Sequence, residues 1–428
     1  MEFTLPGSVE HISEEISLFE GPVTEVGKKT CDFLDYRPTS QPSRSAPLTF
    51  SVMNSNYVDL KKTRLNVKVR ITKKNGHPMV VADKVALVNL SLHSIFRSVD
   101  VSLQGIDTST AIGSNYPYKA MFDVLLDDED LNVQTSHFCK DTRGLMDSLI
   151  MDLEGHSPDQ INAGLYERHL WAKNSDIIEM EGEIQADIFK QDRLLLNGVR
   201  MNLTFYPHSD NFALMYGGED AYYEVHIVDA KLRVCTASLK PATLDGHAKM
   251  LESKNALYPY TATAMNVYSI PAGTWTWCMD DCFQNKIPSK VVIAIVSSEA
   301  YAGSPKLNPF NFKHWDVSYL DFMVNGQSRP GQPFMPDFEN RSYMSTYLAM
   351  ASEFNKNRDM MINVKDFKHG YCMFVFNIDD SKALIKTGNT RIILKMAKAL
   401  PETVNILVYG HFPALMEINK ERQVKLHV

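Results

Sequence analysis

The chain has few cysteines, and they are not arranged as a disulfide-stapled or zinc-binding fold requires. Six cysteines are spread over 428 residues, and only Cys278 and Cys282 lie close together. Zinc knuckles and ribbons need a second matching pair, and none follows this one. Scattered cysteines are typical of proteins that keep their thiols free in a reducing compartment. We therefore expect buried free thiols, with neither a disulfide framework nor a bound metal.

Catalytic motifs are also missing. The thirteen histidines are dispersed without a His-x-His pair, which a metal-dependent jelly-roll enzyme would place on one strand. The chain has no Gly-x-Ser-x-Gly, no P-loop and no dinucleotide-binding fingerprint. The polar stretch that contains Asp141, Arg143 and Asp147 lacks the spacing of a catalytic group. We expect no enzymatic activity and no cofactor.

The sequence lacks the features of a secreted, membrane-spanning or generally DNA-binding protein. Its longest aliphatic run is residues 291–296, far short of the roughly 20 residues that a membrane span needs. The first residues carry acids where a signal peptide needs a basic region. The net charge of -7 gives no overall attraction to phosphate. We expect a soluble protein made in the cytosol, without a membrane span or specific nucleic-acid binding.

What the chain does contain is a repeated order of elements. Residues 99–105 (VDVSLQG) form a period-two strand with a glycine turn, and an aromatic amphipathic stretch follows at 116–126. The same order recurs at 319–326 (YLDFMVNG) and 343–351. A pair of apolar strands follows in each half, at 199–205 with 225–234 and at 391–396 with 404–412. The order predicts two fused copies of one fold, each of about 190 residues.

Each half is predicted to be an all-β domain. Between residues 56 and 71, apolar Leu65, Val67, Val69 and Ile71 alternate with polar residues, as in a strand with one buried face. The count is about eight strands per half, the number of a jelly roll. Residues 85–96 fit either a helix or a strand, and residues 305–312 and 330–338 are predicted to be irregular loops. We predict two tandem eight-stranded jelly rolls with short helices in the inter-strand loops.

The domain boundaries follow from composition. Residues 1–46 are rich in Glu, Thr, Ser and Pro and are predicted to form an N-terminal arm. The first jelly roll is predicted over 47–237 and the second over 238–428, joined by a polar, helix-like stretch at 239–257. The arm is either disordered or lies along a neighbouring subunit or the inner face of an assembly.

Aromatic residues cluster in the two irregular loops of the second half. We predict that these residues form an interface between subunits: Phe310, Phe312, Trp315, Phe334 and Phe338. The alternative is that each phenylalanine fills the core of its own domain under a long loop.

These segments resemble those of a known family. The order TFSVMNSNYVDLKKTRLNVKVRI, LVNLSLHSIFRSVDVSLQG, NYPYKAMFDVLL, LNPFNFKHWDVSYLDFMVNG and ALPETVNILVYGHFPALMEINKERQV is similar to that of the major capsid proteins of Polinton or Maverick elements and adintovirus-like DNA viruses. The resemblance extends from about residue 48 to residue 428.

The resemblance implies a double jelly-roll capsid protein. Three chains would form a pseudo-hexagonal capsomer, and capsomers would self-assemble into an icosahedral shell, so the protein would be located in the virion. The implied partners are other copies of the chain, in a homotrimer and between capsomers, and a penton or minor capsid protein. The alternatives are a minor capsid protein, a receptor- or glycan-binding attachment protein built on tandem β-sandwiches, and an enzyme on a paired jelly roll.

Overall fold

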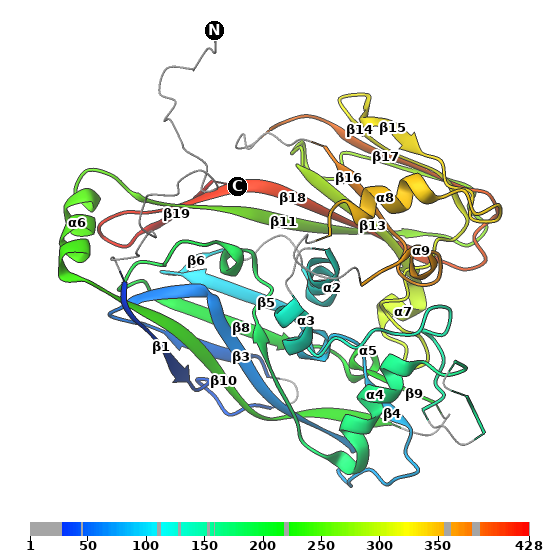
Figure 1. The fold of residues 1–428 in the computed structure, drawn as a ribbon, viewed down its shortest axis with the longest axis horizontal. Helices are drawn as coiled ribbons and strands as arrows, with labels where there is room; N and C mark the ends of the chain where they lie inside the picture. Colours follow the sequence, from blue (N-terminus) through cyan, green and yellow to red (C-terminus); the bar gives the residue numbers. More distant parts are fainter. Residues whose placement is uncertain are drawn as a thin grey trace, which may run out of the picture.

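The chain folds into two β-barrels that lie one against the other (Figure 1). The computed structural model describes residues 28–43, 46–108, 113–126, 130–151, 155–157, 159–217, 222–354, 361–378 and 386–427. Of the predicted arm, residues 1–27, 44 and 45 lie outside the described residues.

The first barrel consists of two four-stranded antiparallel sheets. One has the order β1 (Lys28–Tyr36), β10 (Tyr223–Leu239), β3 (Tyr57–Lys73) and β7 (Ile178–Glu183). The other has the order β2 (Leu48–Val52), β8 (Met201–Pro207), β5 (Phe96–Leu103) and β6 (Ile106–Asp107). A short pair, β4 (Val85–Leu87) with β9 (Leu214–Tyr216), lies beside them. The connecting helices are α1 (Ser91–Ser94), α2 (Tyr116–Leu126), α3 (Asp130–Thr135), α4 (Ala163–Ala172), η1 (Lys173–Ser175), η2 (Asp187–Lys190) and α5 (Asp210–Ala213).

Helix α6 (Pro241–Leu251) leads into the second barrel, which also has two main sheets. One has the order β11 (Ala256–Ile270), β18 (Val404–Ile418), β13 (Lys290–Ser297) and β16 (Met373–Asn377), and β19 (Val424–His427) pairs with β18. The other has the order β12 (Thr276–Asp280), β17 (Thr390–Met396), β14 (Val317–Val324) and β15 (Gln327–Phe334). Its helices are α7 (Ser298–Ala302), α8 (Met344–Ala351) and α9 (Val364–Lys368).

The two barrels have the same topology. When the eight main strands of each half are numbered in chain order, both halves give one sheet of strands 1-8-3-6 and one of strands 2-7-4-5. This is the strand order of a jelly roll. Helices α2 and α8 also follow the same strand in each half, β6 and β15. The prediction of an all-β chain with two tandem eight-stranded jelly rolls is confirmed.

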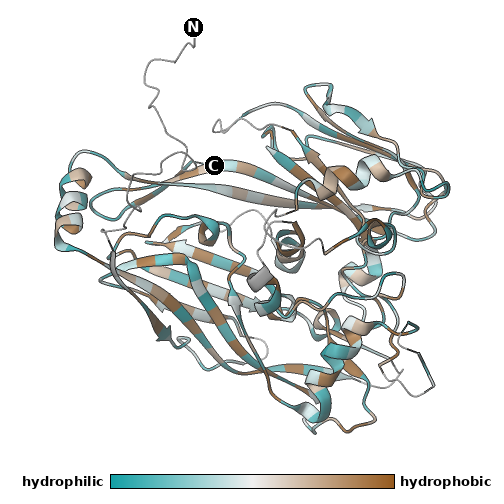
Figure 2. Cartoon of the chain, viewed as in Figure 1, coloured by the Kyte–Doolittle hydropathy of each residue, from teal (hydrophilic) through white to brown (hydrophobic). Residues whose placement is uncertain are grey.

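Alternation of apolar and polar residues builds the cores. Along β3, Leu65, Val67, Val69 and Ile71 are all buried, and the residues between them face outward. Figure 2 shows the resulting alternation of hydrophobic and hydrophilic residues along the strands of the first barrel. Strand β13 is buried along almost its whole length, as its continuous aliphatic run indicates.

Two edge strands differ from the sequence prediction. Residues 28–36, assigned to the arm, form β1, which pairs with β10 from Lys28↔Leu239 to Tyr36↔Leu232. Strand β1 has no alternating pattern because most of its residues, including Phe33 and Leu34, are exposed. Residues 330–334, assigned to a loop, belong to β15, where Pro330 and Pro333 are tolerated because the strand lies at a sheet edge.

The ambiguous stretch 85–96 contains both kinds of structure. It forms β4, the single turn of α1, and the first residue of β5. The polar stretch between the halves contains α6, as predicted.

Most of the long connections lie at one end of the molecule. The helices α4, α5, α7 and α9 lie at the right in Figure 1, and α6 lies at the opposite end. The molecule therefore has one elaborated end, with the long loops of both barrels, and one plain end that carries the linker.

Candidate interfaces and the junction between the barrels

The phenylalanines predicted to form an interface between subunits are mostly buried inside the chain. Phe310 and Phe312 are 1% and 0% exposed. Their rings contact Tyr118 of α2, with centroid distances of 5.6 and 6.4 Å. Phe122 of α2 lies 5.4 Å from Phe312. These two residues therefore form the aromatic core between the barrels, and the prediction that they contact another subunit is wrong because no surface of theirs remains free.

Phe338 is also buried, at 3% exposure, and stacks on His314 at 4.1 Å. The prediction that Phe338 contacts another subunit is therefore also wrong. Trp315 and Phe334 are half-buried. Trp315 lies under the Lys313 ammonium and donates from Nε1 to the Ile295 carbonyl oxygen, and Phe334 packs on Phe376. For these two residues the interface remains a prediction.

A buried cluster of charges joins α2 and η2 of the first barrel to the second barrel. Lys119 is fully buried and forms ion pairs with Asp123 and, at 3.1 Å, with Asp187. Tyr409 of β18 donates a hydrogen bond to Asp123, at 2.8 Å. Asp187 accepts hydrogen bonds from the backbone N–H and the hydroxyl of Thr263 on β11. The outer face of the β11-β18-β13-β16 sheet is thereby held against the first barrel.

The electrostatics of this cluster keep Asp123 ionised. Burial alone would raise the pKa of Asp123, but the ammonium groups of Lys119 and Lys190 outweigh burial and hold the pKa well below its usual range. Burial lowers the pKa of the nearby His411 well below its usual value. The junction is therefore paired and stable in charge at neutral pH.

A second buried cluster lies at the elaborated end. Arg168 of α4 is 0% exposed and pairs with Asp141 at 2.8 Å. Asn308 of the second barrel donates its amide to Asp141, at 2.9 Å, and Tyr371 donates its hydroxyl to the Asp141 carbonyl oxygen. Asp147, which lies near Asp141 in sequence, instead accepts from the Asn308 backbone N–H and the Asn311 amide. The polar stretch around Asp141 thus connects the two barrels.

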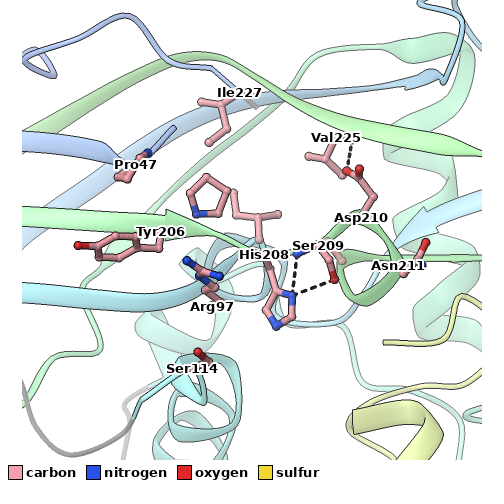
Figure 3. Close-up of a pocket in the computed structure, with 13 residues that line it drawn as sticks. Pro47, Arg97, Ser114, Tyr206, His208, Ser209, Asp210, Asn211, Val225 and Ile227 are labelled. Carbon is pink, nitrogen blue, oxygen red and sulfur yellow. Dashed lines mark hydrogen bonds between the residues drawn. The ribbon is translucent and has the colours of Figure 1, made fainter. Parts of the chain in front are cut away.

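A pocket of about 940 Å³ lies between β8 and α5 (Figure 3). His208 and Ser209 are adjacent there, but His208 Nδ1 lies 2.8 Å from the Ser209 backbone N–H, which donates to it. The Ser209 hydroxyl is more distant, at 3.4 Å. Burial lowers the pKa of His208 to about 4, and its ring stacks on Phe212. Since the ring nitrogen nearest the hydroxyl already accepts a backbone hydrogen bond, the pair is not arranged as a nucleophile and its base.

The two cysteines that lie close together in the sequence differ in their exposure to solvent. Cys278 on β12 is exposed, and Cys282 is buried. Among the described residues, no group of three or more His, Cys, Asp or Glu side chains is placed to hold a metal ion. No helix in the described part of the chain is long and apolar enough to cross a membrane.

Two sheets have outer faces that no other described part of the chain covers. The first outer face belongs to the β1-β10-β3-β7 sheet and consists of Asp35, Asn66, Lys68, Glu179, Glu181, Lys231 and Arg233. Arg233 pairs with Asp35 at 3.1 Å and with Glu181 at 2.9 Å. Asn66 donates to both Glu179 and Glu181. This face is therefore polar, and the charges of Asp35, Lys68, Glu179, Glu181, Lys231 and Arg233 are paired with one another.

The second outer face belongs to the β12-β17-β14-β15 sheet and consists of Cys278, Asp280, Tyr319, Arg391, Ile393 and Lys395. Lys395 lies over the Tyr319 ring at 5.1 Å, and Arg391 pairs with Asp280 at 3.2 Å. Ile393 lies between Cys278 and Asp321 in the strand register. In Figure 1 the two faces lie on opposite sides of the molecule, below β3 and β10 and above β14 and β17. The sequence pattern marks their polar residues as outward-facing, but it does not identify a contact.

Solved structures with this arrangement come from viruses. A chain in the structure of the Sputnik virophage has a TM-score of 0.64 at 10% identity, over 98% of this chain and 93% of that chain. The mavirus major capsid protein has a TM-score of 0.56 at 11% identity, over 99% and 96%. The faustovirus major capsid protein has a TM-score of 0.56 at 7% identity, over 95% and 92%. These likenesses establish the double jelly-roll fold over nearly the whole chain, in agreement with the resemblance seen in the sequence.

The sequence itself has one relative without an assigned role. An uncharacterized protein of Caenorhabditis elegans is 24% identical over 396 residues, which cover 87% of this chain and 91% of that protein. No family model matches the chain.

Proposed function

We propose that the protein is a capsid subunit that assembles into trimers and then into an icosahedral shell. The observation that carries the proposal is the match of both barrels at once, over 99% of this chain, to the mavirus major capsid protein. Both jelly rolls and the linker between them have counterparts there, so the whole building block is shared. The proposed role is structural, without enzymatic activity.

The internal repeat indicates how copies would meet. Within the chain, the outer face of the β11-β18-β13-β16 sheet lies against the first barrel through Thr263 and Tyr409. No described helix or strand of the chain covers the equivalent sheet of the first barrel, β1-β10-β3-β7, in this way. We propose that the second barrel of the next copy covers this first outer face. A head-to-tail contact of this kind closes into a ring, and three two-barrel chains approximate sixfold packing.

The second outer face is the side that the next copy would present. Most of the charged residues named on the two faces form ion pairs with one another, so a contact there would bury few unpaired charges, which would be costly. Ile393 and the half-buried Trp315 and Phe334 of the same barrel supply apolar area. Obligate oligomers bury about 2,000 Å² or more of surface at an interface. We therefore expect residues beyond the two sheets to take part in the contact.

The elaborated end would face away from the shell interior and the plain end toward it. The further partners would be neighbouring capsomers and a penton or minor capsid protein, and the site of action would be the virion, after synthesis in host cytosol. We propose that the described strands of 28–239 form the first capsid domain and those of 256–427 the second.

Electron microscopy and light scattering of the purified full chain test the proposal. We expect triangular or pseudo-hexagonal particles with the mass of three chains. Ile393→Arg introduces an unpaired charge at the second outer face and should shift the protein to monomers by at least tenfold in the dissociation constant. Leu170→Arg, an equally drastic change at an exposed position of α4 outside both faces, is the matched control.

A wild-type protein that remains monomeric at micromolar concentration would contradict the capsid proposal. Trimers that tolerate Ile393→Arg as well as Leu170→Arg would contradict only the assignment of the face.

A further inference from the structure

Helix α6 is only weakly covered by the described part of the chain. None of its eleven residues is buried, and Leu244 and Met250 are 37% and 54% exposed. A helix this short is marginal in water without tertiary packing. Its one side-chain hydrogen bond to the first barrel among those described joins His247 and Tyr57, 2.9 Å apart. The described contacts therefore leave most of the helix surface open to a further contact.

Beneath α6 lies a largely apolar pocket of about 590 Å³. Its floor includes Leu194, Leu196 and Tyr258, and its wall includes Met250 and Leu251 of α6. Tyr258 is fixed there, because its hydroxyl donates to the Leu194 carbonyl oxygen and accepts from the Leu196 N–H. The pocket is therefore a formed feature at the plain end of the molecule, between the two barrels and their linker.

The chain enters the fold beside this pocket. Strand β1 is antiparallel to β10, and its first residue, Lys28, is paired with Leu239. Leu239 also lines the pocket, and α6 begins two residues later. Residues 1–27 therefore join the structure at the end of β1 that lies next to α6. Since an extended chain spans about 3.3 Å per residue, only a few residues are needed to reach the pocket.

The sequence of residues 1–27 suits an apolar pocket with a basic rim. Val9, Ile12, Ile16 and Phe19 follow one another at intervals of three and four residues, the spacing of one helix face. Gly21 and Pro22 follow directly, as they do after many helices. The segment contains six glutamates and neither lysine nor arginine.

The charges around the pocket favour an acidic segment. Arg193 and Lys254 line the pocket, and Lys240 and Lys249 flank it at the ends of α6. The acids of the linker are Asp245 and Glu252. The residues that line the pocket include two basic groups and no acid, so the lining is net positive, opposite in sign to residues 1–27.

We propose that residues 8–20 of the same chain fold back into this pocket and pack Ile12 and Ile16 against Met250 and Leu251 of α6. The segment would lock the linker to both barrels at the plain end. The inference goes beyond the capsid proposal and does not depend on assembly.

Hydrogen exchange of the full-length protein, read at the amides of α6, tests the proposal. We expect α6 to exchange slowly in the wild type and at least tenfold faster in the double variant Ile12→Asp, Ile16→Asp. The control is His11→Asp, Ser17→Asp, which adds the same charge to the same segment at positions off the apolar stripe and should leave α6 protected. Met250→Asp, on the pocket side, should release the segment and expose residues 8–20 to exchange.

Three results would overturn the proposal. One is fast exchange of α6 in the wild type, and another is equal protection in the two double variants. The third is protection that disappears on dilution, which would mean that the segment comes from another copy. Light scattering on the same samples separates this inference from the capsid proposal, since trimers with unprotected α6 contradict the former alone.

Discussion

At the scale of single residues, the six thiols divide into two classes. Cys139, Cys235, Cys282 and Cys372 are buried, and burial raises the pKa of Cys139 and Cys282 to about 12 and that of Cys235 to about 11. Cys31 and Cys278 are exposed. Because the thiolate is the reactive form, we expect two thiols to react rapidly with a disulfide-exchange reagent at pH 7.5 and four only after unfolding.

The two exposed thiols also test the proposed contact between copies. Cys31 lies on β1, whose sheet has the first outer face, and Cys278 lies on the second outer face. In trimers we expect both thiols to react at least tenfold more slowly than in dilute monomer. If all six thiols reacted rapidly, the assignment of four of them as buried would be wrong. If the two exposed thiols reacted equally fast in trimers and in monomers, the proposed contact would be wrong.

A buried histidine makes stability depend on pH. His93 is 2% exposed, with Nδ1 2.9 Å from the Tyr116 hydroxyl oxygen and Nε2 3.2 Å from the Ser136 oxygen. Burial, assisted by Lys190 and Lys119, lowers the pKa of His93 to about 3. The unfolded chain, with a histidine pKa near 6.5, therefore binds a proton that the folded chain excludes. Stability is present above about pH 6.5 and is lost as the pH falls toward 3.

For His93 alone, we expect the free energy of unfolding to fall by about 2 kcal/mol between pH 7.5 and pH 5. Urea titrations at several pH values measure this. His93→Gln should be less stable at pH 7.5, and its free energy of unfolding should depend less steeply on pH, by the equivalent of up to one proton. The control is His77→Gln at an exposed position, which should keep the pH dependence of the wild type. Parallel slopes for all three proteins would show that His93 is not the titrating group.

At the scale of elements, two glycines in helices have opposite surroundings. In α4, a Cβ at Gly164 would lie 2.7 Å from the backbone oxygens of Cys139 and Lys140. In α6, a Cβ at Gly246 would meet nothing within 4 Å. We expect Gly164→Ala to destabilise the protein by about 1–3 kcal/mol, because rigid backbone must move. Gly246→Ala should not destabilise it and should strengthen α6 locally by up to about 1 kcal/mol.

Chemical denaturation of the two alanine variants measures the difference, and the pair controls for the common loss of a glycine. Similar effects at both positions would mean that α4 does not pack as closely on residues 139–140 as the structure indicates.

Elements with a buried face were predictable, and elements without one were not. The alternation in β3 and the aliphatic run in β13 identify those strands because burial imposes the pattern. Strand β1 escaped detection because Phe33 and Leu34 are exposed, and β15 because Pro330 and Pro333 are atypical of strands. Both are edge strands, whose pairing depends on backbone hydrogen bonds more than on side-chain burial.

The surroundings of the aromatic loop residues were harder to predict for a related reason. Phe310 and Phe312 lie in a loop by sequence, and loops usually lie at the surface. Only the fold reveals that this loop is enclosed between the barrels by Tyr118 and Phe122. The polar residues of the first outer face, such as Arg233 and Glu181, gave no signal because paired charges are ordinary on any sheet.

At the scale of the whole molecule, the two barrels are joined through buried polar groups at several places. The Lys119 cluster links α2 and η2 to β11 and β18, and the Asp141 cluster links α4 to Asn308 and Tyr371. Burying charge costs free energy unless partners are in place, so each cluster favours one relative position of the barrels. The chain should therefore behave as one rigid block, which the proposed role as a shell subunit requires.

This rigidity predicts a single cooperative unfolding transition that depends on Asp141. Asp141→Asn keeps the side-chain shape but leaves the fully buried Arg168 without its carboxylate partner. We expect a loss of about 3–5 kcal/mol in the free energy of unfolding, the usual cost of an unpaired buried charge. Asp192→Asn, which removes an exposed partner of Lys61, should cost less than about 1 kcal/mol and is the control. Denaturant curves followed by circular dichroism and by tryptophan fluorescence should coincide for the wild type, and two separate transitions would mean that the barrels fold independently.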